Sequence, residues 1–350
     1  MPNHVTNRIT YSGDRLRIKQ MLDEIKSDKY GIGTIDFNKV IPMPESLNIE
    51  SGSRTVSGLK AYKDFIYVHT LGEPDKADAL HIPEECEAAF LRMRSDVNPE
   101  EFALGRIAFQ NIEQYGAPTW YEWCIGNWGT KWNAYDYYES EDYSENEDLR
   151  FQTAWGAPHP VIETLARKYP DISFSHEWAD EDLGQNCGRK EYANGVCTNE
   201  YYPESNKDCI EFAANVMDSD PEDWGLHLNA SGTDYLYLGN ETYECVELFG
   251  KIALFSNDRM SDADIPEGLH CYQLRDTVDG RDFCSIEPFV LVNFGGSIIT
   301  KEPIDFRKEK FIELDKNNSL NFLGGNRISL EQFLNSDISP SDLMSDFHYD

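Results

Sequence analysis

The side chains best suited to chemistry in this sequence lie between His159 and Asp180. His159, His176, Glu177 and Asp180 offer imidazole and carboxylate groups, which bind metal ions and transfer protons in many enzymes. Their spacing matches no established metal-binding motif, so we predict no metal site. A hydrolase or modifying enzyme that uses His159, His176 and Asp180 in a cleft between two domains is the least favoured alternative.

Other catalytic groups do not form recognisable motifs. Serines and cysteines occur without a nucleophile elbow or a partnered histidine. The eight cysteines include no C-x-x-C pair, so we expect neither a zinc site nor a disulfide framework, and we expect the thiols to be reduced. Gly295-Gly296 and Gly324-Gly325 are typical of turns rather than of a phosphate-binding loop. We therefore predict no catalytic residue and no cofactor.

The densest charge in the sequence follows a short aromatic run. Tyr135, Asp136, Tyr137 and Tyr138 lead into an acidic segment that contains Glu139, Glu141, Asp142, Glu145, Glu147 and Asp148. Carboxylates on one face of a strand recur about every 6.6 Å, and B-DNA carries one charge per about 3.4 Å along each strand. An acidic face of this density can imitate a phosphate backbone. The extension of this face is predicted to comprise Glu177, Asp180, Glu181 and Asp182. The alternative is an ordinary solvated loop.

Four tryptophans, Trp120, Trp123, Trp128 and Trp132, precede this acidic segment. Large aromatic side chains most often pack in a core, and we favour that interpretation. The alternative is that one or two of them form an exposed anchor, because tryptophan and tyrosine are enriched in binding hot spots. Lys131 lies among them, and we expect its side chain to cover a ring or to pair with Asp136 rather than to act in catalysis.

The overall charge favours some partners and disfavours others. The chain of 350 residues has 63 acidic and 31 basic side chains, which give a formal net charge of -32. Such a surface repels polyanions, so direct binding to nucleic acid is disfavoured and a basic partner is favoured. The alternative is that acidity only keeps the protein soluble. Because no run approaches the about 20 apolar residues of a membrane helix and no secretory pattern is present, we expect no membrane association and a cytoplasmic location.

Periodicity predicts alternating strands and helices in the first part of the chain. Residues 4–12 alternate as a strand, a helix capped by Asp14 follows, and residues 34–41 form a second extended run. Residues 149–155, 158–169 and 172–178 repeat the order strand, helix, strand, and Asn194-Gly195 is typical of a hairpin turn. We therefore predict an α+β fold, a ferredoxin-like split βαβ sandwich. Residues 58–116 have helical spacing and are too long for a loop, which indicates a helical insertion.

The second part of the chain has a different pattern. Residues 206–217 have the spacing of a helix, and the acidic, proline-containing residues 218–223 are typical of a linker. We predict a first domain over residues 1–217 and a mostly β domain over residues 224–335, in which short apolar runs alternate with turn residues. Ser329-Leu-Glu-Gln332 predicts the start of a short final helix. Residues 336–350 are expected to be an acidic tail.

Several motifs resemble those of known families. Pro2–Arg8, Phe37–Glu45, Trp128–Asp136 and Thr153–Trp155 resemble the YubB ferredoxin-like family of plasmid- and phage-borne proteins over about residues 2–197. Residues 249–255, 265–272 and 299–304 resemble a small domain associated with large polyvalent proteins of mobile elements. Neither resemblance brings a catalytic residue. Together they imply a mobile genetic element that must survive in a bacterial cytoplasm.

Charge and resemblance together predict a function in binding rather than in catalysis. We expect a non-enzymatic inhibitor that binds a host defence nuclease, of CRISPR or restriction type, and nucleic-acid mimicry is one mode of binding that its acidic surface allows. Its partner is expected to be a host protein or nucleoprotein complex with a basic nucleic-acid-binding groove. The alternative is an accessory scaffold in plasmid or phage DNA processing, which recruits its partners through the β domain.

Overall fold

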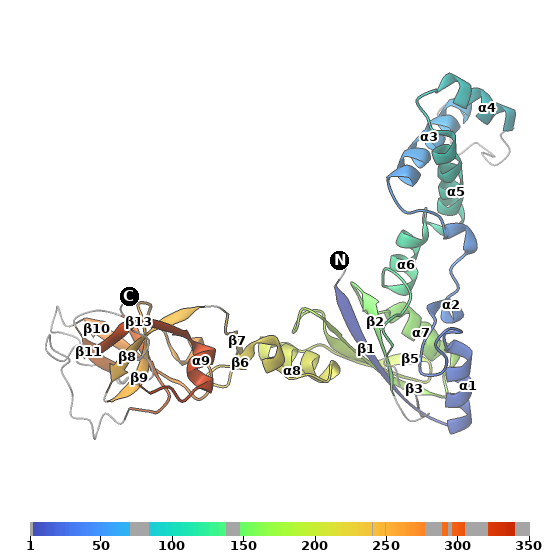
Figure 1. The fold of residues 1–350 in the computed structure, drawn as a ribbon. Coiled ribbons are helices and arrows are strands. Elements are labelled where there is room, and N and C mark those ends of the chain that lie inside the picture. The colour runs from blue at the N-terminus through green and yellow to red at the C-terminus, as the bar shows by residue number, and fades with distance from the viewer. Residues whose placement is uncertain are drawn as a thin grey trace. The chain divides into compact units, whose positions relative to one another are not determined.

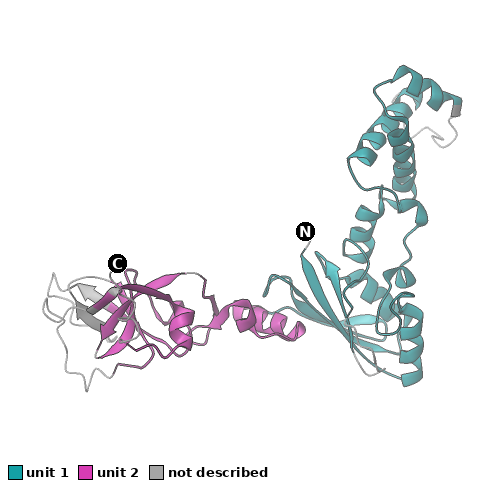
Figure 2. Cartoon of the chain, in the orientation of Figure 1, with its two compact units in different colours: residues 1–203 teal, residues 204–350 magenta. Residues whose placement is uncertain are grey.

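The computed structural model describes residues 3–70, 84–137, 148–239, 241–248, 250–276, 289–292, 296–304 and 321–339. The chain forms two compact units, residues 1–203 and residues 204–350 (Figure 2). Each unit has its own sheet and its own hydrophobic core. The first unit mixes helices and strands, and the second is rich in strands. Among the helices within the described ranges, none is long and apolar enough to cross a membrane.

A five-stranded sheet forms the centre of the first unit (Figure 1). Its strands, in the order in which they lie side by side, are β2 (Leu149–Ala154), β1 (His4–Ser12), β3 (Ser173–Asp180), β4 (Gly188–Ala193) and β5 (Val196–Tyr201). Each neighbouring pair is antiparallel. β2 and β3 therefore run in the same direction on either side of β1, and helix α7 (His159–Lys168) connects them.

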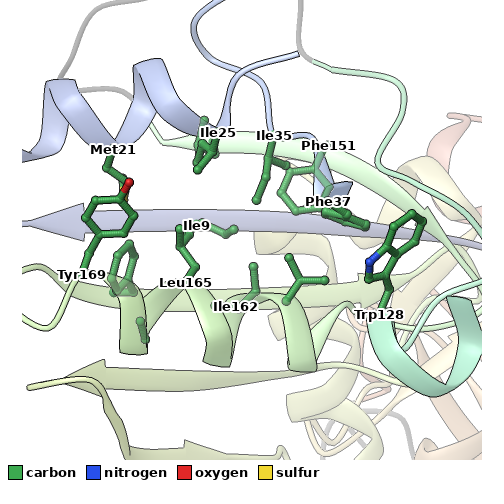
Figure 3. Packing of buried hydrophobic residues seen from close by; sticks show 14 of the residues in the cluster. Ile9, Met21, Ile25, Ile35, Phe37, Trp128, Phe151, Ile162, Leu165 and Tyr169 are labelled. Carbon is green, nitrogen blue, oxygen red and sulfur yellow. The ribbon is translucent and has the colours of Figure 1, made fainter. Parts of the chain in front are cut away.

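One face of this sheet carries the core of the first unit. The alternation predicted for residues 4–12 is confirmed, because Val5, Asn7 and Ile9 are buried. Helix α1 (Arg15–Ile25) begins at Asp14, whose side chain accepts hydrogen bonds from two amides of the first turn, as predicted. Apolar side chains from α1, α7 and the sheet interdigitate in this core (Figure 3). Each such side chain contributes about 1.5–3 kcal/mol when fully buried.

The second strand predicted for residues 34–41 is wrong. The structure has a one-turn helix there, α2 (Phe37–Val40). The side chain of Asp36 caps this helix by accepting a hydrogen bond from the amide of Asn38, and Asn133 binds the amide of Phe37 at 2.9 Å. Local capping therefore replaces sheet hydrogen bonds, although Ile35 and Phe37 still reach the core. Of the two predicted repeats of strand, helix and strand, the second is observed, in β2, α7 and β3.

Helices account for most of the described residues in and around the segment 58–116, for which a helical insertion was predicted; residues 71–83 lie outside the described residues. These helices are α3 (Ser53–Thr70), α4 (Glu84–Met93) and α5 (Pro99–Tyr115), preceded by the 3-10 turn η1 (Glu45–Leu47) and followed by α6 (Trp120–Trp128). Asn98 caps α5 and Gly116 ends it with a left-handed φ of 75°, as the sequence indicates. Aromatic side chains of α3, α4 and α5 form a separate small core.

The second unit contains the remaining elements. Its helices and 3-10 turns are α8 (Asn206–Val216), η4 (Pro221–Trp224), η5 (Asp262–Asp264) and α9 (Leu330–Asn335). Its larger sheet has the order β11 (Phe289–Val292), β10 (His270–Asp276), β12 (Gly296–Thr300), β9 (Lys251–Ser256), β8 (Thr242–Leu248) and β13 (Asn321–Ser329), and a second sheet pairs β6 (Leu226–Leu228) with β7 (Tyr235–Tyr237). The predicted capping box at Ser329 is confirmed.

The division between the units lies before α8, whereas the sequence pattern places the boundary after it, at residues 218–223. Hydrogen bonds account for the difference. Lys207 Nζ donates to the carbonyl oxygen of Gly232 at 2.9 Å, and Asn206 Nδ2 donates to Asp234 Oδ1 at 2.7 Å. These contacts hold α8 to the second unit. Residues 340–350 of the predicted acidic tail lie outside the described residues.

A candidate partner-binding surface at the strand ends

The start of β1 and the ends of β2 and β3 lie at the same edge of the first sheet, because β1 is antiparallel to both neighbours. Two backbone hydrogen bonds and one from a side chain join the adjoining loops to this edge. Trp155 N donates to the carbonyl oxygen of Asn3 at 2.9 Å, and Glu181 N donates to that of His4 at 2.8 Å. Thr130 Oγ1 donates to the carbonyl oxygen of Ala154 at 2.9 Å.

We call this region the strand-end surface. It comprises the half-buried or exposed side chains of Tyr121, Lys131, Trp132, Tyr135, Asp136, Trp155, Glu181 and Asp182.

Aromatic rings and one lysine form the first half of the strand-end surface. The Trp155 side chain is 44% exposed. Its ring lies edge-on to Tyr121, with centroids 6.0 Å apart. Lys131 Nζ lies 4.6 Å from the ring centroid of Trp155 and 4.6 Å from that of Trp132. The expectation that Lys131 covers a ring is therefore confirmed, and its charge contributes cation–π attraction to both indoles.

Carboxylates form the second half. Asp136, Glu181 and Asp182 are exposed, and within the described part of the chain their side chains form no ion pair. Tyr135 precedes Asp136 in the chain, and its ring centroid lies 6.2 Å from that of Trp132. Its hydroxyl lies 2.6 Å from His4 Nδ1. Burial, with smaller contributions from Asp136 and Glu181, raises the pKa of Tyr135 to about 12. Tyr135 is therefore neutral at physiological pH and acts as a fixed polar group.

The backbone at this surface is strained. Five non-glycine residues of the described chain have positive φ, and three of them lie here: Asp136 at 44°, Trp155 at 71° and Asn186 at 39°. Asn186 Nδ2 donates weakly to the carbonyl oxygen of Trp155 at 3.5 Å. Each such residue costs about 1–3 kcal/mol and persists only where surrounding contacts impose the conformation. Strain of this kind clusters at binding and catalytic sites, which marks this edge as a candidate site.

Two predicted members of the acidic face contribute no free charge. Glu177 is mostly buried and forms ion pairs with Arg8 at 2.7 Å and Arg189 at 3.9 Å. Asp180 is only 5% exposed. It accepts hydrogen bonds from Asn3 Nδ2 at 3.1 Å and Asn186 Nδ2 at 3.3 Å, and so connects the loops beneath the surface. Glu177 and Asp180 also do not share one acidic face, because β3 directs their side chains to opposite faces of the sheet.

Of the other predicted members of the acidic segment, the structure describes Tyr137 and Asp148. Tyr137 packs against the core and donates a hydrogen bond to the carbonyl oxygen of Ile35 at 2.6 Å, so it is part of the architecture. Asp148 is half-buried and pairs with Arg150 at 3.0 Å. The remaining members, Tyr138, Glu139, Glu141, Asp142, Glu145 and Glu147, lie outside the described residues.

The tryptophan segment is mainly structural, as favoured from the sequence. Trp123 and Trp128 are buried in the core, and Trp128 Nε1 donates to the carbonyl oxygen of Ile41 at 2.9 Å. Trp132 is half-buried at the strand-end surface. Sequence reasoning missed the most exposed indole there, Trp155. Its signal was the position of a large aromatic residue directly after a strand and before Gly156, where an extended strand ends.

The two histidines lie inside the first unit. His176 is fully buried, and its Nε2 lies 2.9 Å from Asn7 Oδ1. The amide of Asn7 donates to Val5 and Thr153, which fixes its oxygen toward His176, so Nε2 of His176 carries the proton. The ring centroids of His159 and His176 are 5.6 Å apart.

Burial keeps both imidazoles neutral. It lowers the pKa of His159 to about 4 and that of His176 well below its usual value. Asp180 bonds to Asn3 and Asn186 rather than to either histidine. Among the described residues no three His, Cys, Asp or Glu side chains are placed to hold a metal ion. The three residues of the enzyme alternative are therefore not assembled as one catalytic group.

Two family models match parts of the chain. Residues 127–220 match the ferredoxin-like domain in Api92-like protein, and residues 239–335 match large polyvalent protein associated domain 28. One solved structure, a protein api92 from Yersinia pseudotuberculosis, is similar over 59% of this chain and 99% of that chain. The sequence identity is 12% and the TM-score is 0.28, which is too low to support an argument. No curated protein matches.

These matches support part of the sequence-based resemblance. The chain contains a ferredoxin-like domain and a domain associated with large polyvalent proteins. The resemblance to the YubB family itself gains no support from them. The ferredoxin-like model extends to residue 220 and so includes α8, the helix whose hydrogen bonds hold it to the second unit.

Proposed function

We propose that this chain is a non-enzymatic protein of a mobile genetic element that inhibits a host defence nuclease, of CRISPR or restriction type, by binding to it. The observation that carries the proposal is the strand-end surface, which combines the exposed Trp155 ring with three exposed carboxylates that form no ion pair with any described residue. The match to a domain associated with large polyvalent proteins is consistent with a mobile element. We propose that the binding surface belongs to a split βαβ sandwich and that the protein acts in the bacterial cytoplasm.

The chemistry of this surface indicates the chemistry of the partner. An exposed indole can fill an apolar pocket of a partner, and central tryptophans often dominate binding energy. Asp136, Glu181 and Asp182 attract cationic groups, and the net charge of -32 strengthens long-range attraction to a basic protein. We expect a basic groove that normally holds nucleic acid to offer both a pocket for the indole and cationic groups for the carboxylates. The acidic side chains would occupy the positions of phosphates in such a groove.

Replacing the indole tests the anchor. Trp155→Ala should weaken binding to a purified defence complex about 30-fold, because a hot-spot side chain contributes about 2 kcal/mol. Binding can be measured by surface plasmon resonance with immobilised CRISPR and restriction complexes. Trp224→Ala removes an indole that is 41% exposed on the second unit and should leave affinity unchanged. Equal losses in the two variants would contradict a role specific to Trp155.

Neutralising the three carboxylates tests the electrostatic contribution to partner binding. The triple variant Asp136→Asn, Glu181→Gln and Asp182→Asn should slow association about tenfold at low salt and flatten its salt dependence, while dissociation changes little. The matched variant Glu113→Gln, Glu204→Gln and Glu267→Gln removes the same charge from other exposed positions. If both triple variants associate equally slowly, only the overall charge matters and the surface is not the binding site.

The domain associated with large polyvalent proteins also favours a second candidate, an accessory scaffold in plasmid or phage DNA processing. Affinity purification from a bacterial host under attack separates the two functions. Recovery of restriction or CRISPR components supports the inhibitor. Recovery of relaxase, helicase or single-strand-binding proteins supports the scaffold.

A further inference from the structure

The second unit has a small pocket that differs from the strand-end surface. Its volume is about 140 Å³, and it lies among the end of β7, the start of β8, the 3-10 turn η5 and helix α9. Leu236, Leu238 and Leu330 provide apolar walls. A closed cavity of about 150 Å³ can hold benzene, so this pocket has room for the end of one side chain rather than for a cofactor.

Two tyrosine rings line the same pocket. Tyr237 is 73% exposed, and its ring packs against the backbone of Gly225 and Gly239, where an added Cβ would lie 3.2 Å from ring atoms. These two glycines support the ring in an otherwise open position. Tyr243 lies deeper, and its hydroxyl donates to Glu241 Oε2 at 3.2 Å. The ring faces of tyrosine attract cations.

The polar part of the pocket is negative. Glu241 and Asp264 contribute carboxylates, and among the described residues that line the pocket there is no lysine or arginine. Asp264 is held in place, because its Oδ2 accepts from Ser261 N and Ser261 Oγ, each at 2.8 Å. Burial and the neighbouring carboxylates raise the pKa of Tyr243 to about 12, so the tyrosine adds a neutral hydroxyl. The pocket therefore combines apolar walls, aromatic rings and an uncompensated negative charge.

We propose that this pocket binds the guanidinium group of an arginine side chain presented by a basic protein partner. Arginine fits all three features, because its methylene chain packs on leucine, its planar cation stacks on tyrosine and its forked N–H groups match carboxylates. An anion would be repelled, and a purely apolar group would leave the negative charge of the pocket uncompensated. The inference stands on the second unit alone, so it does not depend on the proposed function of the strand-end surface.

A titration of the full chain tests this site. Methyl-labelled leucine NMR spectra would be recorded with increasing acetyl-Gly-Arg-Gly-amide. The methyl signals of Leu236, Leu238 and Leu330 should shift, while those of Leu254, buried in the core of the same unit, should not. The peptide with citrulline in place of arginine has nearly the same shape without the charge, and it should cause no shift.

Two variants make the test specific. Glu241→Gln should weaken binding of the arginine peptide about tenfold, since a hydrogen bond to a charged group is lost. Glu267→Gln removes one exposed charge from the same unit and should leave binding unchanged. The Leu254 signals report whether each variant is folded. Equal binding of the citrulline peptide, or unaltered affinity in folded Glu241→Gln, would overturn the proposal, and equal binding of a lysine peptide would overturn the preference for guanidinium.

Discussion

A buried polar atom is costly without a hydrogen bond, and Asn7 supplies one for Nε2 of His176. Asn7 bonds to Val5, Thr153 and His176, and so joins β1, β2 and β3 through side chains. On the other side of His176, its Nδ1 and the Nδ1 of His159 are buried without a partner among the described residues. The pair is therefore adapted to the neutral state and would be poorly accommodated if charged.

Lowering the pH should destabilise the first unit through these histidines. Their folded pKa values lie below the unfolded value of about 6.5, so the unfolded chain binds protons first. Stability is fully present above that value and is lost as the pH falls. For His159, with a folded pKa of about 4, the loss between pH 7 and pH 5 is about 2 kcal/mol.

Urea denaturation of the protein and of His159→Gln at pH 7 and pH 5 measures this effect. The wild-type chain should lose more stability than the variant, since carboxylates titrate equally in both. A loss of the same size in the two proteins would show that His159 does not carry the effect. Lys190, whose charge also lowers the pKa of His159, is present in both proteins.

The exposed residues show how far the sequence alone can lead. Asp136, Glu181 and Asp182 were predicted from their types and are exposed as expected. Strand alternation places Glu177 and Asp180 on opposite faces of β3. The Arg8 side chain that neutralises Glu177, however, comes from a distant part of the chain. Trp155 was missed as a surface residue because it was assigned to the strand 149–155, whereas its exposure depends on a left-handed backbone just after that strand.

At the scale of elements, helices α3 and α5 approach each other closely at two glycines. A Cβ added to Gly105 would lie 2.0 Å from the carbonyl carbon and oxygen of Gly58, and a Cβ on Gly58 would lie 1.7 Å from the carbonyl oxygen of Glu101. The two backbones are therefore in direct contact. Only glycine permits such an approach, although glycine within a helix costs about 1 kcal/mol relative to alanine.

Gly105→Ala should destabilise the first unit by about 2 kcal/mol or more, because overpacking outweighs the gain in helix propensity. Gly126→Ala is the matched control, since Gly126 lies in α6 and an added Cβ there meets nothing within 4 Å. That variant should be more stable by about 0.5–1 kcal/mol. Chemical denaturation followed by circular dichroism measures both changes. Similar stabilisation in the two variants would contradict the close crossing.

Helix boundaries were easier to predict than helix contacts. Asp14, Asn98 and Ser329 cap helices as expected, because capping is a local property of neighbouring residues. The pairing of Gly58 with Gly105 joins residues far apart in the sequence, and nothing local distinguishes it from two unfavourable glycines. The prediction of a strand over residues 34–41 was wrong for a similar reason, since the distant residue Asn133 supplies a hydrogen bond that helps to fix α2.

At the scale of the whole molecule, the two units have separate cores. We therefore expect thermal unfolding in two steps rather than one, since domains with independent cores unfold as separate cooperative units. In differential scanning calorimetry, Gly105→Ala should lower the midpoint temperature of one transition. Leu254→Ala, which truncates a fully buried side chain of the second core, should lower the other. A single transition that moves in both variants would show that the units unfold together.

The left-handed conformation of Trp155 has a consequence for how this sequence can evolve. Glycine or asparagine would adopt a φ of 71° at lower cost, but neither would supply the exposed indole. If Trp155 is the anchor that we propose, folding and recognition make opposite demands on this one position. A library selected only for heat resistance would accumulate small residues at position 155, whereas selection for the partner would retain an aromatic one. The amino acid preferred there would then report which pressure acts on the protein.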